Sequence, residues 1–111
     1  MVARNIRGMV GPGFTVPEAL VDRLHAMMRR PGNSAAFIDL ARTDQADRTA
    51  ELGRLRVPTL VLRGEGIDGQ HFARDIRDAQ ELVLPGVGHL MPEEAPVLVG
   101  DAMLPFLGGR G

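Results

Sequence analysis

The chain has 111 residues, of which 44% are hydrophobic and 24% charged, with a formal net charge of -1 at pH 7. This length supports one domain with a modest core, and the near-zero charge gives no electrostatic reason to expect nucleic acid or an anionic membrane as a partner. The sequence has no cysteine, which excludes disulfides, thiolate metal sites and cysteine nucleophiles. It contains neither an apolar run of signal-peptide length nor one of the roughly 18 residues that a membrane span needs, so we expect a cytoplasmic protein.

Residues 1–13 are expected to form a flexible arm, and residues 14–54 a helical, cap-like segment. The arm is rich in glycine and contains a Gly-Pro-Gly run that favours a loop. A first helix is predicted after Thr15, which can cap it, because apolar residues then recur at helical spacing until a Pro-Gly pair. Asn33 or Ser34 can cap a second helix, and the charged stretch after it predicts a short exposed helix and a connector.

Residues 55–111 predict two parallel strands and their connections. The run at 59–62 is continuously apolar, a pattern typical of a strand covered on both faces of a parallel sheet. Residues 71–79 predict a short crossover helix and residues 81–84 the second strand, which together form a right-handed unit. The predicted fold class is α/β: a helical amino-terminal segment followed by a strand-helix-strand-helix unit of a parallel sheet.

An acid and a histidine follow the two predicted strands. Asp68 lies just beyond the Gly-rich turn that ends the first strand, and His89 follows the second strand after a Pro-Gly-Val-Gly run. Catalytic groups and ligands of open α/β sheets gather at the carboxyl ends of the strands. This pair is therefore typical of the back half of a hydrolytic triad, in which the acid fixes the imidazole tautomer and the histidine acts as a base. The alternative is that both residues lie in solvated turns.

The sequences around these two turns resemble a known family. Residues 57–65 read Val-Pro-Thr-Leu-Val-Leu-Arg-Gly-Glu, and residues 85–96 contain Pro-Gly-Val-Gly-His-Leu followed by Pro-Glu-Glu-Ala-Pro. In this order they resemble the carboxyl-terminal part of an α/β-hydrolase, from about residue 55 to residue 107. The resemblance assigns them to the family's seventh strand with its acid-bearing turn, to its histidine loop and to the start of its last helix.

The resemblance implies a partial α/β-hydrolase fold with His89 as the catalytic base. Asp68 is its implied acid partner, and Glu65 is the substitute. The implied reaction is hydrolysis of an ester, epoxide, halide or C–C bond in a small apolar substrate, with no cofactor and no metal ion. Met91, close to the histidine, could line the substrate pocket.

The resemblance also places the last helix over residues 98–107. Glu93 and Glu94 come just before it, where the helix dipole favours negative charge. We therefore expect both carboxylates to serve the amino-terminal turn of this helix.

The chain departs from the family in its nucleophile and in the position of its acid. The G-x-S-x-G elbow that bears the nucleophile does not occur, and the one serine, Ser34, follows a predicted helix end rather than a strand. The acid usually comes two residues after a Gly-Glu pair, but Ile67 holds that place here and Asp68 follows it. We therefore expect a truncated hydrolase that is inactive alone or nearly so, because the nucleophile elbow is lacking.

A non-catalytic interaction module is the second hypothesis. Two short strands are marginal in water by themselves, and each large apolar side chain left unburied forfeits roughly 1.5 to 3 kcal/mol. The strands therefore call for neighbouring strands to cover four leucines: Leu60, Leu62, Leu82 and Leu84. Such a module would complete a sheet by forming a homo-oligomer or by docking on a partner chain.

Two further patterns are weaker. Residues 64–69 match G-x-G-x-x-G, the turn of a dinucleotide-binding fold. Glu65 and Asp68 count against this hypothesis, because they would place negative charge beside a pyrophosphate. His71 and Asp75 are four residues apart, but a metal ion would need a third ligand nearby.

Overall fold

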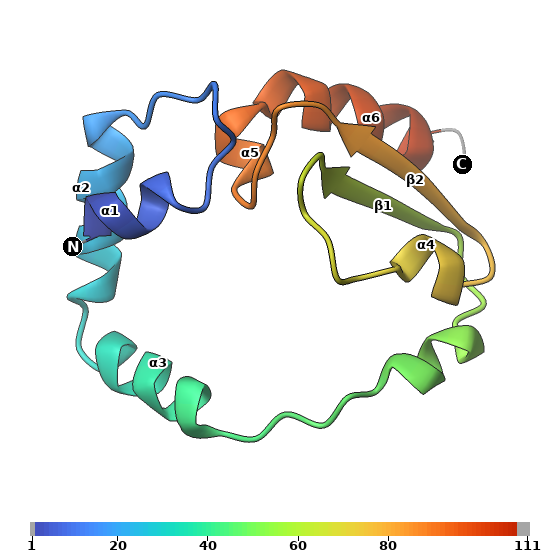
Figure 1. Ribbon diagram of the computed structural model, residues 1–111, viewed down its shortest axis with the longest axis horizontal. Helices are drawn as coiled ribbons and strands as arrows, with labels where there is room; N and C mark the ends of the chain where they lie inside the picture. Colours follow the sequence, from blue (N-terminus) through green and yellow to red (C-terminus); the bar gives the residue numbers. More distant parts are fainter. Residues whose placement is uncertain (1, 109–111) are drawn as a thin grey trace. The chain divides into compact units, whose positions relative to one another are not determined.

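The computed structural model describes residues 2–108, and Figure 1 shows its elements. In chain order these are α1 (Val2–Arg7), α2 (Glu18–Met28), α3 (Asn33–Arg42), the 3-10 helix η1 (Thr49–Arg54), β1 (Thr59–Gly64), α4 (Phe72–Asp75), β2 (Ala79–Leu84), α5 (Met91–Glu94) and α6 (Pro96–Gly108). The chain has the predicted α/β class, with helices first and a parallel pair of strands after them. It divides into two compact units, one of residues 2–8 and 15–47 and the other of residues 9–14 and 48–108.

The first unit consists of α1, α2 and α3. Its buried apolar side chains are Ile6 on α1 and Leu20 on α2, and these two helices contact each other. All residues of α3 are exposed, Phe37 and Leu40 among them. The unit therefore has a small core between α1 and α2, and α3 adds little to it.

The start of the chain differs from the predicted loop over residues 1–13. The segment Val2–Arg7 is helical, and Met1 lies outside the described residues. The cap of α2 also differs, because Pro17 holds the N-cap position in extended conformation and makes no side-chain cap hydrogen bond. The expectation that Thr15 caps this helix is therefore wrong. The boundaries drawn from the sequence at residues 14 and 55 stay a prediction.

Asn33 and Ser34 serve the end of α2 rather than the start of α3. The Asn33 side-chain amide donates a hydrogen bond to the Met27 carbonyl (2.6 Å), and the Ser34 hydroxyl donates one to the Met28 carbonyl (3.0 Å). These carbonyls belong to the last turn of α2, and the Met27 carbonyl also accepts a hydrogen bond from the backbone N–H of Arg30 (3.2 Å). Gly32 precedes α3 with φ +88°, a left-handed conformation that glycine adopts without steric cost.

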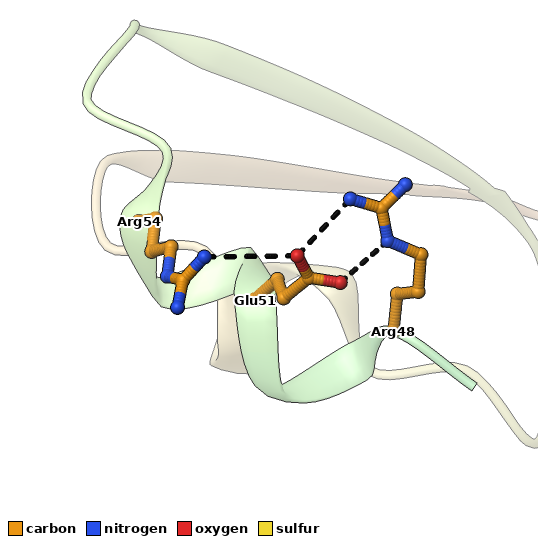
Figure 2. Close-up of polar contacts among 3 residues, drawn as sticks. All are labelled: Arg48, Glu51 and Arg54. Carbon is orange, nitrogen blue, oxygen red and sulfur yellow. Dashed lines mark hydrogen bonds and ion pairs between the residues drawn. The ribbon is translucent and has the colours of Figure 1, made fainter. Parts of the chain in front are cut away.

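The 3-10 helix η1 carries an exposed cluster of ion pairs, shown in Figure 2. The carboxylate of Glu51 accepts two hydrogen bonds from the guanidinium of Arg48 and lies 3.7 Å from Nη1 of Arg54. The bond from Arg48 lowers the pKa of Glu51 and raises that of Arg48. Because the cluster is exposed, its contribution to stability is small.

The strands β1 and β2 pair in parallel, with Thr59 opposite Ala79 and Gly64 opposite Leu84. Their connection contains α4, which is a single turn of four residues and shorter than the helix predicted over residues 71–79. The parallel pairing brings the carboxyl ends of both strands to the same edge of the sheet (Figure 1). The loops after β1 and β2 therefore start side by side.

The core of the second unit lies at this edge. Leu84 at the end of β2, Val87 in the loop after it and Val99 on α6 form a buried cluster, against which Leu62 and Met91 pack. Val87 thus anchors the loop after β2 in this core. The hydrophobic effect therefore holds the start of this loop against α6.

The remaining surface of the sheet is poorly covered. Leu82 and Val83 of β2 are 45% and 42% exposed, and most of β1 is only half-buried. The apolar pattern predicted strands covered on both faces, and residues 2–108 do not supply that cover. No helix in this described range is both long and apolar enough to cross a bilayer.

Candidate active site

The loop of residues 85–90, here called the histidine loop, leaves β2 and carries His89. Gly86 has φ +71°, a left-handed conformation suited to glycine. Gly88 is buried, and a side chain there would collide with the carbonyl oxygen of Met9. The backbone N–H of His89 donates to that same carbonyl at 2.6 Å. Residues 85–90 are therefore held against a segment near the start of the chain.

The turn that follows β1 carries Glu65 and Asp68 and is here called the acid-bearing turn. It contacts the histidine loop closely. A side chain at Gly64 would collide with the carbonyl oxygen of Val87, so glycine is needed at the end of the strand. The Glu65 carboxylate accepts a hydrogen bond from the backbone N–H of Gly86 (3.0 Å). Glu65, the substitute acid of the sequence hypothesis, thus supports the histidine loop by binding its backbone.

Glu94, at the end of α5, binds two backbone N–H groups of the histidine loop. Its carboxylate accepts hydrogen bonds from the backbone N–H groups of Gly11 (2.6 Å), Gly88 (2.9 Å) and Leu90 (3.0 Å). The sequence suggested only that Glu93 and Glu94 serve the last helix. For Glu94 this expectation is wrong, because none of its three partners belongs to the last helix, α6.

A hollow of about 130 Å³ opens beside His89. Its wall is mostly apolar and includes Leu62, Ile67, Phe72 and Met91. Met91 therefore lies where its position near the histidine suggested. The hollow has the character of a site for a small apolar group.

Arg63 also lines this hollow. Its Nη1 donates to the carbonyl of Ile67 (3.3 Å), and its Nε lies 3.5 Å from the carboxylate of Glu81. The guanidinium thus ties the acid-bearing turn to β1, and Glu81 balances its charge. The hollow therefore gains little net positive charge from this arginine.

Asp68 lies in the exposed part of the acid-bearing turn. Ile67 and Gln70, on either side of it, line the hollow, whereas the Asp68 carboxylate does not. Within residues 2–108, no hydrogen bond or ion pair joins Asp68 to His89. The fold thus brings the two loops to one edge of the sheet without joining the two side chains.

The other titratable residues considered from the sequence have different surroundings. His71 precedes α4, and the Asp75 carboxylate accepts a hydrogen bond from Nε of Arg74 (2.9 Å), which lowers the pKa of Asp75. Across the described part of the chain, no group of three His, Asp or Glu side chains is placed to hold a metal ion. The helix after the Gly-rich turn at 64–69 has four residues, so it offers a pyrophosphate only a weak dipole.

Comparison with known proteins gives a likeness in structure but none in sequence. No model of a protein family matches the chain, and no curated protein matches it in sequence. Among solved structures, it is similar to a serine hydrolase involved in carbazole degradation, the CarC enzyme, with a TM-score of 0.81 over 96% of this chain. The likeness shows the fold alone: a partial α/β-hydrolase fold. The sequence identity is 18%, and the chain spans 46% of that hydrolase.

Proposed function

We propose that the chain is the carboxyl-terminal part of an α/β-hydrolase and contributes the acid and the histidine of its triad. The observation that carries this proposal is the position of His89, in a tightly held loop beside an apolar hollow at the carboxyl ends of two parallel strands. In this role His89 removes a proton from the nucleophile and later activates water. Asp68 orients the imidazole and stabilises its protonated form.

The nucleophile comes from outside these residues in our proposal. The Ser34 hydroxyl is bonded to a carbonyl at the end of α2, which suits a helix end and not an elbow between strand and helix. A second polypeptide segment with a G-x-S-x-G elbow and oxyanion donors would complete the site. This proposal requires that Asp68 lies within hydrogen-bonding distance of His89 in the completed protein.

The proposed substrate is a small apolar molecule with an ester, epoxide, halide or C–C bond to be cleaved. The wall of the hollow supports this class, because apolar side chains outnumber polar ones there. The similar structure is that of a serine hydrolase involved in carbazole degradation. The proposed chemistry uses only side chains and water.

Reconstitution tests this proposal. The chain is mixed with a separately expressed polypeptide that carries the elbow and the oxyanion loop, and hydrolysis of a chromogenic short-chain ester is followed. We expect hydrolysis by the mixture and none by either part alone. Asp68→Asn should lower kcat by about 1000-fold or more, whereas Glu65→Gln should lower it less. The reverse order would make Glu65 the acid.

A non-catalytic interaction module is the second candidate, and the uncovered sheet favours it. A groove of about 510 Å³ runs between the strands and α6, with Leu60, Leu82 and Phe106 in its wall. In this hypothesis a second copy or another chain fills the groove and extends the sheet. Analytical ultracentrifugation should then find a dimer or a stable complex. A well-folded monomer at high concentration would contradict this candidate.

A further inference from the structure

We propose that Glu94 is a positioning residue that fixes the imidazole of His89 by binding the backbone on both sides of it. The carboxylate and its three N–H partners, those of Gly11, Gly88 and Leu90, are here called the Glu94 clip. The inference rests on the proposed role of His89 as the catalytic base. It adds that the segment at residues 9–11 is part of the machinery that places this base.

The geometry of the clip surrounds His89. Oε1 of Glu94 accepts from Gly11 and Gly88, and Oε2 accepts from Leu90, so one carboxylate holds the residues before and after the histidine. The N–H of His89 itself donates to the carbonyl of Met9. Three consecutive backbone donors of the loop are thereby fixed. The histidine side chain is left free to face the hollow, which it lines.

A carboxylate suits this position better than any other side chain. It accepts at both oxygens and carries the charge that strengthens bonds from backbone N–H groups. An amide in its place would present an N–H₂ group to one of these donors, and that contact would be repulsive. Glu94→Gln should therefore open the clip with almost no change in side-chain volume.

The clip does more than cap a helix. Its bond to Leu90 resembles that of a capping-box glutamate, because Leu90 is the N-cap residue of α5. The bonds to Gly11 and Gly88 satisfy no helix end, and Gly11 is 83 residues away from Glu94 in the sequence. A side chain at Gly11 would collide with the carbonyl oxygen of Gly86, so this segment contacts the loop directly. The clip therefore joins two distant parts of the chain at His89.

Amide hydrogen exchange by NMR tests the clip on the 111-residue chain itself. In Glu94→Gln we expect the amides of Gly11, Gly88 and Leu90 to exchange about 10- to 100-fold faster. The amides of β1 and β2 should keep their rates, because the opening is local. The control is Asp101→Asn, which removes an exposed carboxylate from α6 and should change none of these rates.

Two results of this experiment would overturn the inference. One is an unchanged exchange rate at the three amides in Glu94→Gln. The other is an increase shared equally by the strand amides, which would reduce Glu94 to a general stabiliser. If the variant does not fold, the wild-type chain still decides, because the clip requires slow exchange at all three amides. If these three amides of the wild-type chain exchange as fast as those of the exposed turn at 66–69, the Glu94 clip does not exist.

The reconstituted hydrolase gives the second readout. Glu94→Gln should lower kcat by about 10- to 100-fold and leave KM nearly unchanged, because a displaced base slows the chemical step more than it weakens binding. An unchanged kcat would show that Glu94 does not position His89. The proposed function fails separately: if His89→Ala keeps full activity while the exchange results hold, the clip is real but its histidine is not the base.

Discussion

At the scale of single residues, close backbone approach decides which glycines matter. Side chains at Gly11, Gly64 and Gly88 would all collide with backbone atoms of the histidine loop or of its neighbours. Each of these glycines has a negative φ, so their requirement is one of space and not of conformation. The sequence showed a chain rich in glycine, but it did not show which glycines lie against another segment.

Replacement of Gly88 by alanine should therefore destabilise the chain. The added methyl group would overlap the Met9 carbonyl oxygen, and we expect a loss of about 1–3 kcal/mol in the free energy of unfolding. The control is Gly100→Ala on α6, where nothing lies near the new methyl group and alanine favours the helix by about 0.5–1 kcal/mol. Urea denaturation of both variants checks this. Equal stability of the two would contradict the close contact.

The Glu51 cluster gives a prediction about pH. Because Arg48 lowers the pKa of Glu51 in the folded chain, the pair stabilises the fold above the pKa that Glu51 has in the unfolded chain. This contribution is lost as the pH falls through the lowered pKa. In Arg48→Gln the pKa of Glu51 should rise, as measured by NMR titration of its carboxyl carbon. An unchanged pKa of Glu51 would exclude the hydrogen bonds between Arg48 and Glu51 that Figure 2 shows.

At the scale of elements, the core around the histidine loop should carry much of the second unit's stability. Leu84 is 7% exposed and packs with Val87 and Val99. Leu84→Ala should therefore lower the free energy of unfolding by about 2–5 kcal/mol. Leu82 on the same strand is 45% exposed, and its replacement by alanine should cost about 1 kcal/mol or less. Chemical denaturation measures both. Similar losses would mean that the core lies elsewhere.

The elements could be predicted from the sequence where the signal was local. Continuous apolar runs located both strands, and helical spacing located α2. The helix ends were predicted less well, because the side chains of Asn33 and Ser34 bind backward to α2 instead of forward into α3. Local propensity identifies a capping residue but does not say which of two adjacent helix ends it satisfies.

The candidate site was predicted only in part for a related reason. His89 and Asp68 could be named from their places after two strands. Glu94 could not, because its partners are backbone N–H groups, which have the same chemistry at almost every residue. The one local signal was its spacing of four residues from Leu90, which is close to that of a capping box.

At the scale of the whole molecule, apolar side chains on β2 and α6 are exposed. Leu82 and Val83 on β2 and Leu104 and Leu107 on α6 are all exposed. Large contiguous apolar patches mark interfaces, and the segment that we propose as the second part of the hydrolase would cover these side chains. The chain covers 46% of the similar serine hydrolase.

In our proposal, His89 is the base of a hydrolase that another segment completes. The most direct measurement is the rate of ester hydrolysis by the reconstituted protein with His89→Ala, beside His25→Ala as the matched control. His25 lies exposed on α2 in the other unit, so its replacement should leave the rate unchanged. We predict that His89→Ala lowers kcat by about 1000-fold or more. Equal rates for the two variants would contradict the account.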